Sequence, residues 1–212
     1  MSQAAFFTMS WLVGASPAAC AEPPHVATSV AAVHAPIAEQ ASYGVSDLQE
    51  MARRSGLPLR HATLGFYIGD FGQEILVDTA RRASPDGSKC GYLTTVTVRL
   101  FLANRLVEVA DDLDGRGCRA AAVLQHYRKH AGADDVVLSR YVQSVTQALK
   151  EAWPQMRTKL GPSGDNDEPG LRNVVQAVLD GALRDYDRVR TEAIAAVDTP
   201  KEVESLTCGS RT

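Results

Sequence analysis

The sequence predicts an α+β fold, in which a small antiparallel sheet is followed by a histidine-bearing helix and two long packed helices. Two observations support this fold class. Between His61 and Ala110 the chain is rich in β-branched residues and alternates apolar with polar positions, which is typical of strands. Past Gly117 the apolar positions recur in steps of three and four, which is typical of amphipathic helices.

The N-terminal segment carries the pattern of a secretory signal peptide. Residues 5–19 form an apolar run that is too short to span a bilayer. The small-x-small sequence Ala19-Cys20-Ala21 and then Glu22 follow this run. We therefore predict that residues 1–21 are removed and that the mature protein is periplasmic or secreted. Lipidation at Cys20 is the less favoured alternative.

The rest of the chain divides into a leader and one domain. Residues 22–45 are rich in Ala, Pro, Val and Ser without a clean period, so we predict a flexible leader. Residues 46–208 form the single predicted domain, which starts with a short helix over 46–56. Strands are expected over 61–69, 73–79, 92–102 and 105–110, with turns at 84–88 and at Ala103-Asn104. Helices are expected over 118–132, 134–160 and 171–197.

Composition excludes several classes of function. Charged residues make up 22% of the chain and the net charge is only −3, so the basic footprint of a nucleic-acid-binding protein is missing. After signal cleavage no apolar run is long enough for a transmembrane segment. The chain also lacks a phosphate-binding glycine loop and a Gly-x-Ser-x-Gly elbow. An envelope protein or peptide of unknown identity is the partner that we expect.

Two histidines carry the strongest chemical signal in the chain. His126 and His130 are four residues apart on a predicted helix, so both imidazoles project from one face, one turn apart. This is the spacing of the zinc ligands in His-Glu-x-x-His. Tyr127 stands where that motif has the Glu that acts as general base. The sequence therefore predicts a pair of metal ligands without the residue that activates water.

Four features occur in a fixed order in the second half of the chain. They are the strand-like Leu106–Leu113, Gly117-Cys118 before the helix with His126-Tyr-Arg-Lys-His130, a pair of long helices, and the closing Asp198-Thr199-Pro200-Lys-Glu202 with Cys208 shortly after. Together they resemble a family of small secreted bacterial proteins with a zincin-type metalloprotease core. The resemblance covers roughly residues 88–208 and implies a zincin-like fold with zinc as the cofactor. Because Tyr127 departs from the family's motif, we assign no catalytic residue.

A zinc site needs at least a third protein ligand. The resemblance implies that this ligand lies further along the chain, where no histidine follows His130 and only carboxylates are available. We favour Glu192, on the third helix, so that His126, His130 and Glu192 form the predicted site. Its rivals are Asp185, Asp187 and Glu151. The alternative is a degenerate site, in which hydrogen bonds satisfy the two histidines without a metal.

Three cysteines remain after signal cleavage, namely Cys90, Cys118 and Cys208. An oxidising compartment permits disulfides, and an odd number leaves one thiol over or paired with another chain. If the chain turns near Ala103-Asn104, Cys90 comes close to Cys118, and we favour this disulfide. Such a bridge would contribute about 3 kcal/mol. The competing pair is Cys118 with Cys208.

Two functions from different classes are consistent with these observations. The favoured one is an exported envelope protein with a degenerate zincin-like fold, which acts as a binding or interaction protein and is not an active peptidase. The alternative is a zinc-dependent hydrolase or peptidase that uses the pair His126 and His130. The missing Glu favours the first function, and the intact histidine pair favours the second.

Overall fold

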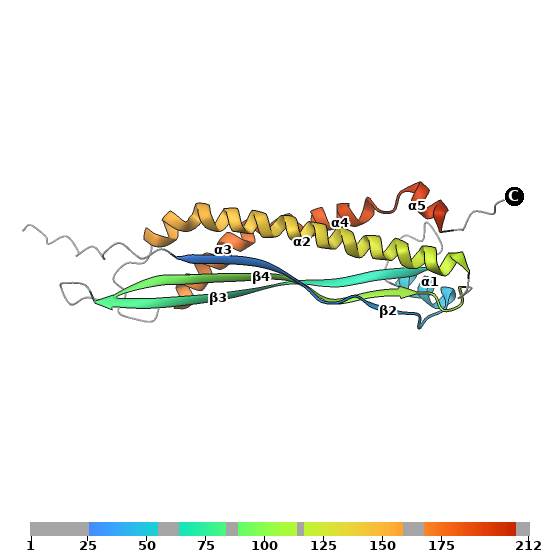
Figure 1. Cartoon of the computed structure of the whole chain (residues 1–212), viewed down its shortest axis with the longest axis horizontal. Helices are drawn as coiled ribbons and strands as arrows, with labels where there is room; N and C mark the ends of the chain where they lie inside the picture. The colour runs from blue at the N-terminus through green and yellow to red at the C-terminus, as the bar shows by residue number, and fades with distance from the viewer. Residues whose placement is uncertain (1–25, 55–63, 84–88, 114–116, 159–167, 207–212) are drawn as a thin grey trace, which may run out of the picture.

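A computed structural model confirms the α+β class; it describes residues 26–54, 64–83, 89–113, 117–158 and 168–206. The described residues form a four-stranded sheet with one long helix lying along it, and shorter helices return beside that helix (Figure 1). The predicted signal peptide, residues 1–21, lies outside the described part of the chain.

The sheet is built around one long strand. β4 (Lys89–Val109) pairs antiparallel along its length with β3 (Gly65–Ala83), so the two strands form a long hairpin. On the other side of β4, β1 (Ala27–His34) and β2 (Ala38–Gln40) pair with it in parallel, one after the other. Pro36 lies between β1 and β2, where a residue without an N–H interrupts a strand. The predicted antiparallel pairing is therefore found between β3 and β4, and the two parallel strands that β1 and β2 add make the sheet mixed.

Part of the predicted flexible leader belongs to this sheet. β1 pairs with residues 95–102 of β4, and β2 pairs with residues 106–108. Most side chains of β1 and all those of β2 are exposed, because these strands form an outer edge. Within β1 only Val30 and Ala32 are half-buried against the core, and β2 has no buried side chain, so the hydrophobic alternation is too short to give a clear strand signal in the sequence. The prediction of a flexible leader is wrong for these residues.

The turn expected at Ala103-Asn104 is a β-bulge inside β4. Asn104 has a φ of 49°, and the register of the hairpin shifts between Ile68 and Asp70 on the facing strand. Asn adopts positive φ more readily than most other residues, in turns and in bulges alike. Its side-chain amide donates to Oδ2 of Asp70 at 2.7 Å across the strands. The four strands expected between residues 61 and 110 are therefore two long ones.

The histidine-bearing helix is much longer than expected. α1 (Val45–Arg54) confirms the short helix predicted over 46–56. α2 (Cys118–Thr158) has 41 residues and combines the helices expected over 118–132 and 134–160. The helix continues through Gly132, although glycine inside a helix costs about 1 kcal/mol of stability relative to Ala. A Cβ at this position would meet only open space. Neither α2 nor any other helix of the described part is long and apolar enough to cross a bilayer.

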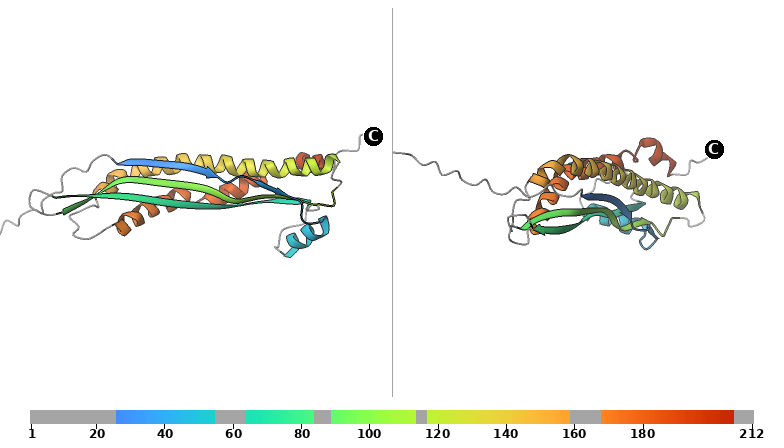
Figure 2. Two further views of the ribbon diagram at one scale, coloured as in Figure 1. Left: turned by 60° about the horizontal axis from the view of Figure 1, so that its bottom comes forward. Right: turned by 60° about the vertical axis from the view of Figure 1, so that its left-hand side comes forward.

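The third expected helix is divided in two. α3 (Glu168–Leu183) and α4 (Tyr186–Ala195) are separated by a break, and α5 (Pro200–Ser205) follows. These helices run back along α2 toward its N-terminal end (Figures 1 and 2). The return path brings the residues that follow α4 beside the first turns of α2.

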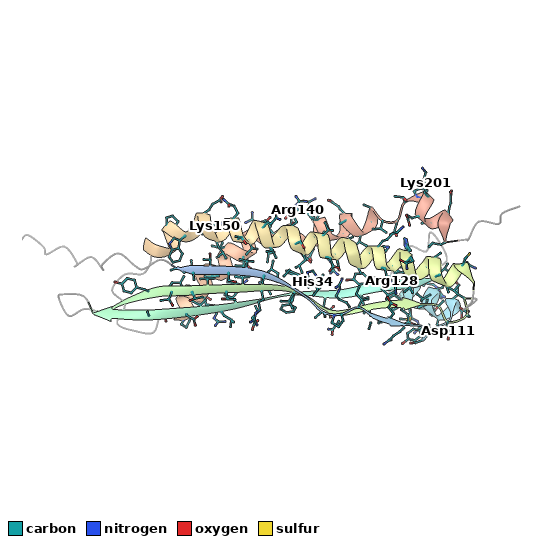
Figure 3. The ribbon with its side chains drawn as sticks, viewed as in Figure 1. His34, Asp111, Arg128, Arg140, Lys150 and Lys201 are labelled. Atoms are coloured by element: carbon teal, nitrogen blue, oxygen red, sulfur yellow. The ribbon has the colours of Figure 1, made fainter. Side chains whose placement is uncertain are left out.

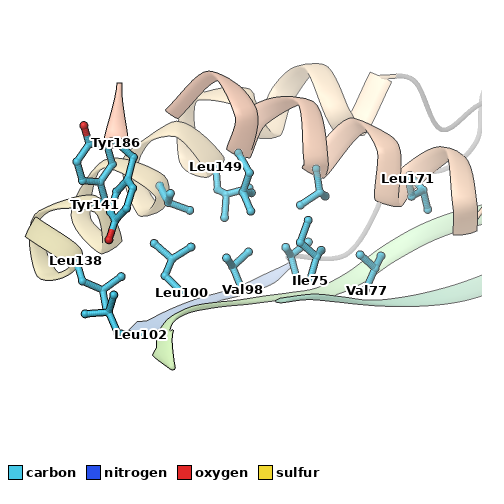
Figure 4. Close-up of a cluster of buried hydrophobic side chains, with 14 of the residues drawn as sticks. Ile75, Val77, Val98, Leu100, Leu102, Leu138, Tyr141, Leu149, Leu171 and Tyr186 are labelled. Carbon is cyan, nitrogen blue, oxygen red and sulfur yellow. The ribbon is translucent and has the colours of Figure 1, made fainter. Parts of the chain in front are cut away.

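A hydrophobic core joins the helices to one face of the hairpin. Figure 4 shows helix residues Leu138, Tyr141, Leu149, Leu171 and Tyr186 facing strand residues Ile75, Val77, Val98, Leu100 and Leu102. Alternate residues of a strand share one face, which explains the spacing of two along β3 and β4. A second cluster, which includes Val107, Val109 and Val123, lies at the end of the sheet where α2 begins. Each fully buried Val or Leu contributes roughly 1.5–3 kcal/mol to folding.

Candidate metal centre

The buried stripe of α2 is interrupted by polar residues. On either side of the interruption, Val123 belongs to one hydrophobic cluster and Val137 to the other. Between them, His126, His130 and Asp134 continue the stripe in steps of four, and all three are buried. Burying polar side chains costs free energy unless each one finds partners. This part of α2 is therefore organised around polar contacts.

The two histidines converge on a carboxylate from the far end of the chain. Their Nε2 atoms lie 3.1 Å apart, as the spacing of four on one helix predicts. Oδ1 of Asp198 lies 3.0 Å from Nε2 of His130 and 3.1 Å from Nε2 of His126. This group can hold a metal ion. Three ligands of a tetrahedral zinc lie about 3.3 Å apart at normal bond lengths, so the atoms need to move by only a few tenths of an ångström.

Hydrogen bonds alone do not satisfy this triangle of atoms. Each of its three contacts requires one hydrogen between the two atoms, and an imidazole Nε2 carries at most one. The ionised carboxylate supplies none, so two histidines cannot complete three contacts. A cation at the centre accepts a lone pair from all three atoms. Because three contacts share at most two hydrogens, the arrangement suits a bound metal better than hydrogen bonds alone.

Asp198 is fixed by the turn between α4 and α5. Its N–H donates to the carbonyl of Ala195 at 3.1 Å, which extends the end of α4. Thr199 then caps α5 by accepting the N–H of Glu202 at 3.3 Å, and Pro200 occupies the first helical position. Thr199 and Glu202 have the spacing of a capping box. The end of one helix and the start of the next thus hold the backbone of Asp198.

Glu192, the expected third ligand, lies outside the group, and Asp198 takes its place. Glu192 is on α4, where its side chain is 63% exposed and accepts hydrogen bonds from Arg188 at 2.8 and 3.0 Å. Arg188 also pairs with Asp185, one of the rival ligands. Asp198 opens the Asp-Thr-Pro-Lys-Glu motif that the resemblance had singled out. That motif was the one signal in the sequence that could have indicated Asp198 as the third member of the group.

Tyr127 packs against both histidines and keeps its proton. Its ring stacks on His130 with centroids 5.4 Å apart and meets His126 edge-on at 5.1 Å. Gly65 on β3 permits this close approach, since a Cβ there would lie 2.7 Å from Cε2 of Tyr127. Burial, and then the charge of Asp198, raises the pKa of Tyr127 to about 12. The phenol is therefore a poor base at neutral pH.

The environment of His130 favours the neutral imidazole that binds metals. Burial lowers the pKa of His130, the charge of Asp198 opposes this effect, and His126 lowers the pKa further. The side chains of His126 and His130 are only 5% and 7% exposed, whereas that of Asp198 is 49% exposed. The group is thus open to solvent on the Asp198 side, which gives an ion a path to the site.

A buried ionic cluster continues the polar stripe along α2. Asp134, which is 0% exposed, accepts hydrogen bonds from Nε and Nη2 of Arg190, each at 2.7 Å, and from the hydroxyl of Tyr67 at 2.9 Å. Arg190 also donates to the carbonyl of Gly69 at 2.6 Å, opposite the bulge of β4. This cluster ties β3 and α4 to α2 one turn beyond His130. It holds α4 in the position from which Asp198 reaches the histidines.

The favoured disulfide between Cys90 and Cys118 does not fit the backbone. Cys90 lies at the start of β4, whereas α2 begins at Cys118 beyond the end of β4. β4 has 21 residues, which at about 3.3 Å each separate its two ends by roughly 65 Å. A disulfide needs Cα atoms about 5.5 Å apart. The prediction depended on a chain reversal at Ala103-Asn104, which does not occur.

The competing pair, Cys118 with Cys208, stays a prediction. No cysteine of the described residues is free, but Cys208 lies outside them. Leu206, which the structure does describe, packs against the same cluster as Ala120 on the first turn of α2.

Comparison of this chain with protein-family models, curated proteins and solved structures finds no match. The zincin-like resemblance of residues 88–208 is therefore not supported by a relative and stays a hypothesis. Function has to be argued from the chemistry of the site itself.

Proposed function

We propose that this protein binds a divalent transition metal, zinc above others, through His126, His130 and Asp198. The observation that carries the proposal is the convergence of three donor atoms, 3.0–3.1 Å apart, from positions up to 72 residues apart in the chain. Two imidazole nitrogens and one carboxylate oxygen suit zinc better than magnesium or calcium, which prefer oxygen ligands. Zinc also favours the tetrahedral geometry that this triangle approaches.

In this proposal the protein is an exported binding protein and not a peptidase. Zinc-dependent peptide hydrolysis needs a group that takes the proton of the metal-bound water. Tyr127 occupies the position of that group in the zincin motif, and its pKa of about 12 keeps it protonated. The signal-like N-terminus favours a periplasmic or secreted location, where an envelope protein or peptide is the expected partner.

Metal analysis of the purified mature protein tests this proposal. We expect about one zinc per chain, which a chelator removes, and loss of stoichiometric binding in His130→Ala. His34→Ala is the matched control, because His34 is also paired with an aspartate, Asp135 at 2.7 Å, but lies outside the group. A wild-type protein that neither carries nor takes up zinc, nickel or cobalt would contradict the proposal.

A zinc-dependent hydrolase is the second candidate, and one observation favours it. The described group supplies three protein ligands and is exposed on the Asp198 side, which leaves a position for water or substrate as in catalytic zinc sites. A general base typically contributes about 10²–10⁴-fold, so hydrolysis without one would be slow.

The variants Tyr127→Glu and Tyr127→Phe test the hydrolase, with added zinc and an unstructured protein as substrate. If only Tyr127→Glu gains chelator-sensitive cleavage, the site has the geometry of a hydrolase and lacks only the base. Fast, chelator-sensitive cleavage by the wild type would favour the hydrolase over the binding protein.

A further inference from the structure

We propose that Glu202 orients His126 for metal binding and that Lys129 competes with His126 for the Glu202 carboxylate. In this arrangement Glu202 accepts a hydrogen bond from Nδ1 of His126 while Nε2 binds the metal. The inference rests on the proposed metal site and adds a pair of residues, Lys129 and Glu202, that sets its affinity.

One ring nitrogen of His126 is an unsatisfied buried atom in the described structure. Nδ1 of His126 is buried and has no hydrogen-bond partner among the residues that the structure describes, and the side chain is only 5% exposed. When Nε2 gives its lone pair to a metal, the neutral ring carries its hydrogen on Nδ1. That N–H is then a buried donor, which costs free energy until it finds an acceptor. Metal-binding histidines almost always have such an acceptor on the second nitrogen.

The carboxylate of Glu202 faces this nitrogen. Its Oε2 lies 4.0 Å from Nδ1 of His126, about 1 Å beyond hydrogen-bond length. The Glu202 side chain is 31% exposed, so it has room to rotate over this distance. The short segment that contains Asp198 and Glu202 would thus supply both a metal ligand and the group that orients another ligand. A carboxylate in this position raises the basicity of the imidazole and strengthens its bond to the metal.

Lys129 holds the same carboxylate in this structure. Its Nζ donates to Oε1 and Oε2 of Glu202 at 2.6 and 2.7 Å. A glutamate carboxylate is charged at neutral pH, so Lys129 and Glu202 form an ion pair. Oε2 therefore faces two donors, Nζ of Lys129 and Nδ1 of His126, and a tight pair with Lys129 draws it away from the ring. The ammonium also places a positive charge close to the cation.

Two variants that break the same ion pair are expected to act in opposite directions on metal affinity. Glu202→Gln removes the charge that orients His126 and is expected to weaken zinc binding about 10–100-fold. Lys129→Met frees the carboxylate for His126 and removes a nearby positive charge, so it is expected to tighten zinc binding. If the ion pair served only to anchor α5, both variants would weaken binding alike.

Matched controls lie on the same short helix. Lys201→Met and Glu204→Gln make the same changes of charge at exposed positions of α5, and Lys201 is labelled in Figure 3. Affinity is measured on the full mature chain by competition with a chromophoric zinc chelator. Urea unfolding of each metal-free variant shows whether the fold is intact.

Weaker binding by Glu202→Gln together with tighter binding by Lys129→Met, each relative to its control, supports the inference. If Glu202→Gln binds zinc as tightly as the wild type, or if both variants weaken binding alike, the inference is overturned while the metal site stands. If the wild type binds no metal, the proposed function fails as well.

Discussion

Oδ1 of Asp198 lies 3.0 Å from Nε2 of His130, although 68 residues separate them in the sequence. This contact attaches the segment after α4 to α2. α5 has only six residues, which is too short for a helix that is stable without tertiary contacts. The described attachments of the segment include Asp198, the pair of Lys129 with Glu202, and Leu206. A bound metal is therefore expected to hold this segment in place.

Zinc is expected to protect the C-terminal segment from proteolysis. A ligand at 100 times its Kd stabilises the arrangement that binds it by about 2.7 kcal/mol, which reduces local opening about 100-fold. A lysine-specific protease, followed by mass spectrometry, reports cleavage after the exposed Lys201 with zinc or with a chelator. Cleavage after Lys150, an exposed residue in the other half of α2, is the control (Figure 3). Equal rates after Lys201 in both conditions would show that the metal does not hold the segment.

Removal of Arg190 is expected to destabilise the protein strongly. Arg190→Met leaves the charge of Asp134 buried at 0% exposure with one described hydrogen-bond donor, the hydroxyl of Tyr67. Breaking a buried ion pair in this way costs about 3–5 kcal/mol. Arg188→Met is the control, since Arg188 is on the same helix but 61% exposed, and its loss should cost less than about 1 kcal/mol. Similar free energies of unfolding for the two variants in urea would contradict this account of Asp134.

Alkaline pH is expected to destabilise the protein through Tyr67. Burial is the largest cause that raises the pKa of Tyr67 from 10.0 to about 12. Between these values the folded protein keeps a proton that the unfolded chain has lost. The contribution to stability is thus complete below pH 10 and is lost as the pH rises through 12.

The measurement is urea unfolding at about pH 9 and pH 11, on either side of the ordinary tyrosine pKa. The wild type should lose more stability over this interval than Tyr67→Phe. Tyr43→Phe, at a position that is 43% exposed, should behave as the wild type does. An equal loss in the wild type and in Tyr67→Phe would rule out this role of Tyr67.

The native protein is expected to begin at Glu22 and to carry one intramolecular disulfide, between Cys118 and Cys208. Because Leu206 and Ala120 pack against one cluster, the chain approaches the first turn of α2 just before residue 208. Intact mass gives the N-terminus, and peptide mapping without reduction gives the connectivity. An unprocessed chain with free thiols would refute both export and the bridge.

Most helices and strands could be recognised as such from the sequence, but the residues at which they begin and end could not. Capping residues at its two ends identified α1, and helical periodicity identified the buried stripe of α2, since both signals are local in the sequence. Asn104 at positive φ looks the same in a tight turn and in a bulge, and only the pairing of β4 with β3 distinguishes them. Gly132 resembles the end of a helix, but α2 continues because tertiary packing outweighs one unfavourable residue. β1 and β2 were missed because they are exposed edge strands.

The candidate site could likewise be predicted only in part from the sequence. His126 and His130 could be paired from the sequence because a spacing of four on a helix fixes their geometry. The third member of the group could not be predicted from the sequence, since Glu192 and Asp198 are carboxylates of similar chemistry a few residues apart. The choice between them depends on where α4 ends and on the return of α3 and α4 along α2. No local pattern contains that long-range geometry.

The most direct test of the metal site compares Asp198→Asn with Glu192→Gln by zinc competition titration of the mature protein. Asp198→Asn removes a charged ligand, so it should weaken zinc binding by more than the roughly 10–100-fold typical of residues that only orient a ligand. Glu192→Gln removes the same charge from an exposed position on α4 and should leave the affinity unchanged. Equal affinity of Asp198→Asn and the wild type, or a loss confined to Glu192→Gln, would contradict the assignment of His126, His130 and Asp198 as the metal site.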